Sequence, residues 1–112
     1  MSATISTHVL DVARGTPAAG VPVALYAIDG EERKLIASAV TNDDGRTDDS
    51  LARVERAGTY ELVFAAGAYL RALGGAPFLD DVPVRFVVAA PEGKYHVPLL
   101  LSGAGYTTYR GS

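Results

Sequence analysis

Apolar and polar residues alternate in several short runs along the chain, and clusters of turn residues separate these runs. Between positions 59 and 64, the apolar residues Tyr60, Leu62 and Phe64 occupy every second position. Alternation of this kind is typical of a β-strand with one face toward a core. Similar β-prone runs predict further strands at 5–12, 21–28, 35–41, 84–89, 95–101 and 106–112. The pattern therefore predicts about seven strands separated by turns, as in a β-sandwich or barrel.

Glycine-containing turns mark places where the predicted strands reverse. Asp29-Gly30 lies between two apolar runs and indicates a β-hairpin. The polar segment 42–46 predicts a loop, in which Gly45 can adopt a positive φ at little cost. Residues 48–57 show no readable pattern, so no element is predicted there.

One segment favours a helix. Residues 65–73 are rich in alanine and leucine, and Gly74-Gly75 after them supplies a helix stop. A helix of about two turns is too short to be stable without packing on the sheets. The chain shows no alternation of strands and helices that would build parallel βαβ units. We therefore expect residues 1–112 to form a single domain, an antiparallel β-sandwich with Greek-key connections.

Composition and charge narrow the function classes. The sequence is 48% hydrophobic and 21% charged, as is ordinary for a globular protein, and its net charge is −3 without a basic patch for nucleic acid. No apolar stretch reaches the roughly 20 residues of a membrane helix, and the N-terminus does not resemble a signal peptide. The chain has no cysteine, which excludes disulfides, thiol nucleophiles and cysteine zinc sites. We expect a cytoplasmic protein that binds neither nucleic acid nor membrane.

The two histidines of the chain, His8 and His96, are the main candidates for chemistry. Each falls within a predicted strand, and each taken alone is read as a partly buried histidine with one satisfied hydrogen bond. Together with a carboxylate they could form a zinc site, although no His-x-x-x-His spacing indicates one. Motifs for a nucleophilic serine, a phosphate-binding loop or a calcium loop are absent.

Four segments resemble the transthyretin-related hydrolases in order and spacing. They are Ile5–Asp11 with the Gly15–Ala18 and Gly20–Val23 stretches after it, Thr41–Arg46, Tyr95–Ser102 and Tyr106–Ser112. The similarity also includes 58–62 and the short helix, so it spans nearly the whole chain. The terminal Tyr109-Arg110-Gly111-Ser112 is the most discriminating segment, because the secreted hormone carriers of the same fold lack it. His8 also resembles the hydrolase branch.

The resemblance implies a fold, an assembly and a site. The expected fold is all-β, a transthyretin-like antiparallel β-sandwich of two four-stranded sheets with one short helix. The expected assembly is a homotetramer, with active sites in a channel at the subunit interface and each C-terminus close by. No metal or cofactor is expected. The implied catalytic residues are His8, Arg46, His96 and Ser112, and the implied substrate-binding residues are His8, Arg46, Tyr109 and Arg110.

The implied activity is hydrolysis of 5-hydroxyisourate, a planar cyclic imide formed by urate oxidation, to 2-oxo-4-hydroxy-4-carboxy-5-ureidoimidazoline. Water adds to a ring carbonyl, and the adjacent C–N bond is cleaved. Histidine suits the proton transfers because its unperturbed pKa of about 6.5 is near neutral pH. His8 and His96 are therefore assigned jointly to activating water and protonating the leaving nitrogen. Arg46 offers donors for ring carbonyls or a developing oxyanion, and without the resemblance it would be a solvated loop arginine.

The terminal residues have alternative roles. Tyr109 and Ser112 supply hydroxyl groups, whereas without the resemblance they would be a packed strand residue and a frayed chain end. Arg110 either contacts substrate or holds the tail in place through an ion pair. Lys94 stands where relatives often have another histidine, so a third imidazole is absent from the implied site.

Three other functions compete with a metal-free hydrolase. A carrier of a small aromatic ligand would use the same interface channel but would need neither the histidine pair nor the terminal segment. A structural or adhesive sandwich domain would be expected with a secretion signal or further domains. A zinc hydrolase would use His8 and His96 as ligands, and metal analysis of the purified protein would identify it.

Overall fold

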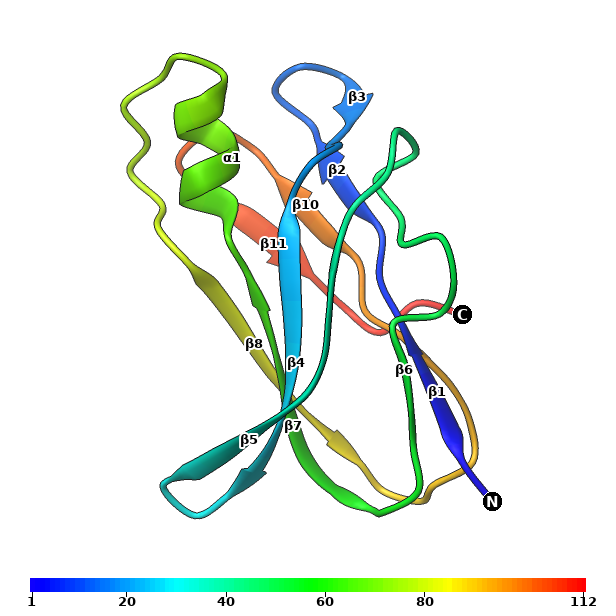
Figure 1. The fold of residues 1–112 in the computed structure, drawn as a ribbon. Coiled ribbons are helices and arrows are strands. Elements are labelled where there is room, and N and C mark those ends of the chain that lie inside the picture. The colour runs from blue at the N-terminus through cyan, green and yellow to red at the C-terminus, as the bar shows by residue number, and fades with distance from the viewer.

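Two layers of strands pack face to face, with one short helix beside them (Figure 1). This computed structural model describes residues 1–112. The first layer is a four-stranded sheet in the order β5-β4-β7-β8, and all its neighbouring strands are antiparallel. Its strands are Pro22–Asp29 (β4), Glu32–Val40 (β5), Gly58–Phe64 (β7) and Val82–Val88 (β8). The strands predicted for this part of the chain are confirmed.

The second layer consists of two sheet pieces placed end to end. One piece has the order β6-β1-β9, and the other has the order β11-β10-β2-β3. Since β1 leads directly into β2 and β9 into β10, the layer is four strand positions wide, and the expected pair of four-stranded layers is confirmed. The strands are Ala3–Ser6 (β1), Val9–Asp11 (β2), Thr16–Pro17 (β3), Ala52–Val54 (β6), Gly93–His96 (β9), Leu99–Leu101 (β10) and Tyr106–Thr108 (β11).

The two central paths of this layer, β1–β2 and β9–β10, run parallel to each other. The antiparallel arrangement expected from the sequence therefore holds for the first layer and for the outer pairs of the second layer, but not for this central pair. Parallel neighbours need a long connection, and the whole first layer lies between β2 and β9 in the chain. The parallel pairing thus places the beginning of the chain beside its last quarter.

Each central path is interrupted, although the sequence predicted one continuous strand for each. The interruptions are Thr7-His8 between β1 and β2, and Val97-Pro98 between β9 and β10. Pro98 has no N–H for a sheet hydrogen bond, and buried Thr7 turns its hydroxyl to donate to the Val97 carbonyl at 2.7 Å. The sheet pieces stay aligned because the Val97 N–H donates to the Ser6 carbonyl at 2.9 Å.

The helix α1, Ala66–Ala72, confirms the predicted helix to within one residue at each end. It is held by buried Tyr69, whose hydroxyl donates to Asp11 at 2.8 Å, and it is followed by Gly74 at φ +92°. No helix in the structure is long and apolar enough to cross a membrane. The unreadable segment 48–57 contains β6, a strand of only three residues.

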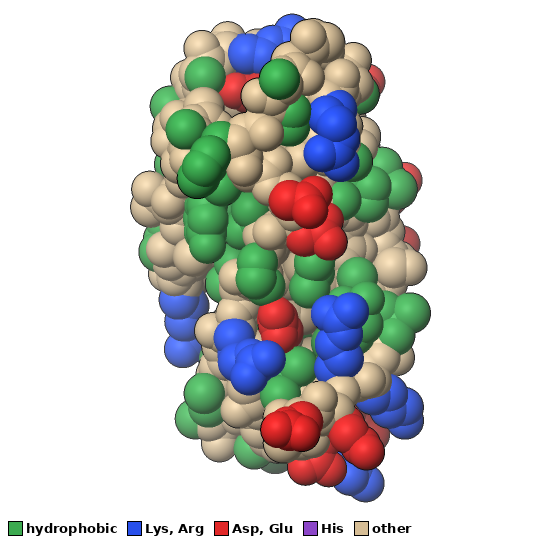
Figure 2. Space-filling model, turned by 90° about the vertical axis from the view of Figure 1, so that its left-hand side faces the viewer, with side chains coloured by type: hydrophobic (Ala, Val, Ile, Leu, Met, Phe, Trp, Pro, Cys, Tyr) green, Lys and Arg blue, Asp and Glu red, His purple; other side chains and the backbone are tan.

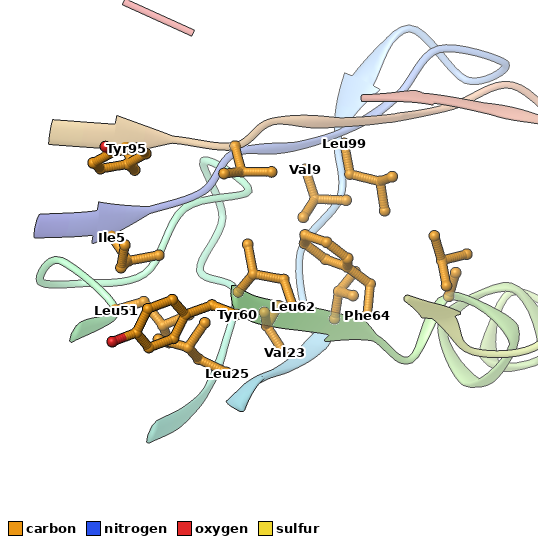
Figure 3. Close-up of a cluster of buried hydrophobic side chains, with 14 of the residues drawn as sticks. Ile5, Val9, Val23, Leu25, Leu51, Tyr60, Leu62, Phe64, Tyr95 and Leu99 are labelled. Atoms are coloured by element: carbon orange, nitrogen blue, oxygen red, sulfur yellow. The ribbon is translucent and has the colours of Figure 1, made fainter. Parts of the chain in front are cut away.

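The hydrophobic core lies between the two layers, and the alternation in β7 determines which side chains enter it (Figure 3). Leu62 and Phe64 are fully buried, and Tyr60 is also buried, with 6% of its surface exposed. They meet Ile5 and Leu99 from the second layer in one cluster of 20 buried residues. Val9, Val97 and Leu99, which lie in or beside the two breaks, belong to this core.

Candidate active site

The interruption of the second layer is the place where three of the four predicted catalytic residues come together. His8 lies in one break and pairs with Arg46 from the 42–46 loop, and His96 ends β9 and pairs with Gly111 near the C-terminus. Both histidines are half-buried, whereas Arg46 is exposed. No histidine is visible on the face in Figure 2, so this site does not open toward that side of the molecule.

His8 is oriented by a backbone carbonyl of the neighbouring loop. Its Nε2 lies 2.8 Å from the carbonyl oxygen of Asp44. A carbonyl oxygen can only accept, so Nε2 carries a proton and donates it. In the neutral ring Nδ1 is then the unprotonated nitrogen, and in the protonated ring Nδ1–H becomes a free donor.

The half-buried His96 ring lies between Ser6 of β1 and Gly111 of the C-terminal segment. Its Nδ1 is 2.9 Å from the hydroxyl oxygen of Ser6. Burial lowers the pKa of His96 below its usual value, and the positive charges of Arg46 and protonated His8 lower that pKa further. The His96 ring is therefore neutral at neutral pH and can accept a proton.

The loop that supplies Arg46 is organised by one side chain and one glycine. The Asn42 side-chain oxygen accepts from the Asp44 N–H at 2.9 Å and from the Arg46 N–H at 3.2 Å. Gly45 has φ +76°, and a Cβ at this position would lie 2.2 Å from the Val9 carbonyl oxygen. The close approach of Gly45 to β2 therefore fixes the position of the adjacent Arg46.

An open hollow of about 380 Å³ lies next to Arg46, and every residue around it is polar. Its lining combines one cation with hydroxyl and carboxylate groups: Ser6, Thr7, Arg46, Thr47, Asp48, Asp49 and Ser50. Such a surface suits a small ligand that is rich in hydrogen-bonding groups.

The C-terminal segment reaches the site through its backbone. The Gly111 N–H donates to the His96 carbonyl oxygen at 2.7 Å. Arg110 donates to the Lys94 carbonyl oxygen at 3.0 Å, and its guanidinium lies 4.0 Å from the centre of the Tyr95 ring. Within one chain Arg110 thus holds the tail on β9, by a hydrogen bond and a cation–π contact instead of an ion pair.

Tyr109 and Ser112 are placed differently from the histidines. Tyr109 is exposed and lines an apolar groove of about 300 Å³ that includes Val84, Phe86 and Val97. Ser112 is exposed and forms no hydrogen bond with either histidine in the single chain. The structure therefore brings His8, Arg46 and His96 together, with the backbone of the tail, but not the hydroxyls of Tyr109 and Ser112.

Three contributions to the site were not predicted from the sequence: the Ser6 hydroxyl, the Asp44 carbonyl and Gly111. Ser6 lies opposite His96 in the register of the parallel strands β1 and β9, and no local pattern reveals such a pairing. The serine two positions before His8 was the available signal, because that spacing places both side chains on one face of an extended strand. No group of three or more His, Asp or Glu side chains is placed to hold a metal ion.

Comparison with known proteins relates the sequence and the fold to one family. Residues 5–111 match the model of the HIUase/Transthyretin family. A 5-hydroxyisourate hydrolase of Mesorhizobium japonicum is 55% identical, over 96% of this chain and 91% of its own. The solved structure of a Klebsiella pneumoniae 5-hydroxyisourate hydrolase is 36% identical, with a TM-score of 0.84 over 98% of this chain and 94% of that one. An (S)-allantoin synthase is 38% identical with a TM-score of 0.89, and this chain spans 44% of its length.

Proposed function

The chain belongs to the HIUase/Transthyretin family, and from this membership we propose that it is a cyclic amide hydrolase that opens the ring of 5-hydroxyisourate, the substrate named in its 55%-identical relative. The observation that supports this function best is the convergence of His8, Arg46 and His96 where the second layer is interrupted. Hydrolysis of an activated ring carbonyl requires a base, an acid and a donor for the oxyanion. These three side chains can supply all three groups.

The protonation states suggest how the work is divided between the histidines. His96, with its lowered pKa, is neutral and removes a proton from the attacking water. Arg46 donates hydrogen bonds to the oxygen that becomes negative as water adds to the carbonyl. His8, when protonated at Nδ1, gives that proton to the leaving nitrogen as the C–N bond breaks, while its Nε2–H stays on the Asp44 carbonyl. Exchange with solvent then returns both rings to their starting states.

The proposed activity is tested by generating fresh 5-hydroxyisourate with urate oxidase and following its ultraviolet absorbance. We expect its decay to be faster with this protein than without it, and to remain faster after chelator treatment. Acceleration that chelation abolishes would favour the zinc hydrolase. No acceleration by folded protein would favour a carrier of a small aromatic ligand, which would then be detected by equilibrium binding.

The pH dependence should follow the titration of His96. Because burial and Arg46 lower its pKa, the neutral base persists below pH 6.5, and on the acid side of the profile kcat/KM should begin to fall only below that value. Arg46→Gln removes one of the charges that disfavour protonation, so the pKa of His96 should rise. Imidazole NMR titration measures this independently of turnover. Arg33→Gln, in the other layer, is the matched control, and an unchanged His96 titration in Arg46→Gln would contradict the assignment.

The exposed sheet edges support the homotetramer implied by the family. The strands β8 and β11 are edges of their sheets, and the apolar groove with Tyr109 lies between them. Val87 on β8 is 64% exposed and Tyr109 is 55% exposed, although unpaired apolar edges are normally covered. We propose that these edges pair between subunits and that the assembled channel brings tail hydroxyls to the histidines. Sedimentation equilibrium should give four times the 11.7 kDa chain mass, and a monomer would contradict this assembly.

We also propose that the enzyme acts in the cytoplasm. The sequence contains no cysteine, so its stability owes nothing to an oxidising compartment. Cell fractionation followed by the hydrolysis assay tests this location, and activity confined to a membrane or periplasmic fraction would contradict it.

A further inference from the structure

We infer that Ser6 is a positioning residue for His96: its hydroxyl accepts a hydrogen bond from Nδ1–H, which keeps Nε2 unprotonated and available as the base. This inference rests on the proposed hydrolase function and adds to it a residue that neither contacts the scissile bond nor transfers a proton. The hydrogen bond with Ser6 also determines which of the two nitrogen atoms of His96 reacts.

The first observation is the fixed distance between the two side chains. Ser6 and His96 are register partners on the parallel strands β1 and β9, and the Ser6 hydroxyl lies 2.9 Å from Nδ1. The backbone around Ser6 is held on both sides of the break. Its carbonyl accepts from the Val97 N–H at 2.9 Å, and the next residue, Thr7, is buried and bonded to the Val97 carbonyl. The hydroxyl is therefore held in place by the surrounding sheet.

The second observation is a close contact on the opposite edge of the ring. Gly111 packs against His96 so tightly that a Cβ on Gly111 would lie 2.7 Å from the ring atom Cδ2. The ring is thus held between the Ser6 hydroxyl at its Nδ1 edge and Gly111 at its Cδ2 edge. Only the end of the ring that carries Nε2 remains without a protein partner.

The direction of the hydrogen bond follows from the chemistry. A serine hydroxyl can donate to an unprotonated Nδ1 or accept from a protonated one. If it donated, Nε2 would carry the proton and the free end of the ring could not act as a base. Neighbouring positive charge, from Arg46 in the loop and from protonated His8, opposes a second proton on the ring. The state compatible with catalysis therefore has one proton, on Nδ1, donated to Ser6.

The experiment compares Ser6→Ala with Ser6→Thr, which restores a hydroxyl. Thr4→Ala is the matched control, because Thr4 is half-buried two residues earlier on the same face of β1 and is opposite Lys94. We expect Ser6→Ala to lower kcat roughly 10- to 100-fold through misplacement of the base, with KM unchanged. Ser6→Thr should recover most of the kcat, and Thr4→Ala should behave as the unsubstituted protein. Thermal unfolding confirms that each variant is folded.

A second measurement is independent of turnover. Long-range ¹H–¹⁵N spectra report the protonated nitrogen of each imidazole, and the chain has only two histidines. We expect the Nδ1–H tautomer for His96, and a shift toward Nε2–H in Ser6→Ala. An Nε2–H tautomer in the unsubstituted protein, full kcat in Ser6→Ala, or equal losses in Ser6→Ala and Ser6→Thr would each overturn the inference. Absence of any hydrolysis would contradict the proposed function, and the tautomer would still decide whether Ser6 orients the ring.

Discussion

His96→Ala should lower kcat by roughly 10²- to 10⁴-fold, the range that a positioned acid or base contributes. The imidazole is the neutral base of the proposed mechanism, held by Ser6 and Gly111. Its removal should leave the fold intact, because the bond from the Gly111 N–H uses the backbone carbonyl of residue 96. The measurement is kcat with freshly generated substrate, alongside thermal unfolding of each protein.

Lys94→Ala is the appropriate control for this substitution. Lys94 lies two residues before His96 on the same strand and is exposed, and only its backbone carbonyl contacts the tail. We expect this variant to retain its kcat. Turnover at the normal rate by folded His96→Ala would refute the assignment of the base. A substantial loss in Lys94→Ala would show that the lysine itself takes part in the site.

Removal of Tyr109–Ser112 should have the second largest effect, a loss of about 100-fold or more in kcat, because misplacement of a catalytic group by about 1 Å can have this cost. The truncation deletes the Gly111 contact with His96 and the anchor formed by Arg110 on Tyr95. The strand β11 ends at Thr108, and the buried core contains none of the deleted residues. The loss of turnover is measured as kcat, and circular dichroism checks that the truncated protein keeps its fold.

A chain that ends at Gly111 separates the two roles of the tail. It keeps the contact of Gly111 with His96 and removes only Ser112. We expect it to be more active than the longer truncation and less active than the unsubstituted protein, since the proposed assembly brings the Ser112 hydroxyl to the site. Full activity after removal of all four residues would refute a catalytic role for the terminal segment.

Strong periodicity predicted most of the fold. The alternation of Tyr60, Leu62 and Phe64 identified both the strand and its buried face, and the helix ended where Gly74 allowed it. The strand β6 was not predicted because three residues are too few to establish a period. The break at Pro98 had a local signal, since proline cannot donate within a sheet. The break at Thr7-His8 had none, because it depends on the Thr7 hydroxyl donating to the Val97 carbonyl, 90 residues away.

The site shows the same division between local and distant information. His8 and His96 are the only histidines of the chain, so composition alone made them candidates, and the family resemblance added Arg46 and the tail. The pairing of Ser6 with His96 and the approach of Gly111 depend on strand register and tertiary packing. Neither property is encoded in a local residue pattern. The spacing of Ser6 from His8 was a signal for a polar face, but the contacts of Ser6 and Gly111 with His96 are visible only in three dimensions.

The parallel pairing of β1–β2 with β9–β10 also has a consequence for biosynthesis. Residues 3–11 leave the ribosome well before residues 93–101, with which β1 and β2 form their parallel pairs. Until those residues emerge, the edge of the β1–β2 segment that pairs with β9 and β10 stays without a partner. Contacts between residues so distant in sequence also form slowly. The growing chain should thus acquire its catalytic site last, after the first layer, β5-β4-β7-β8, has begun to form.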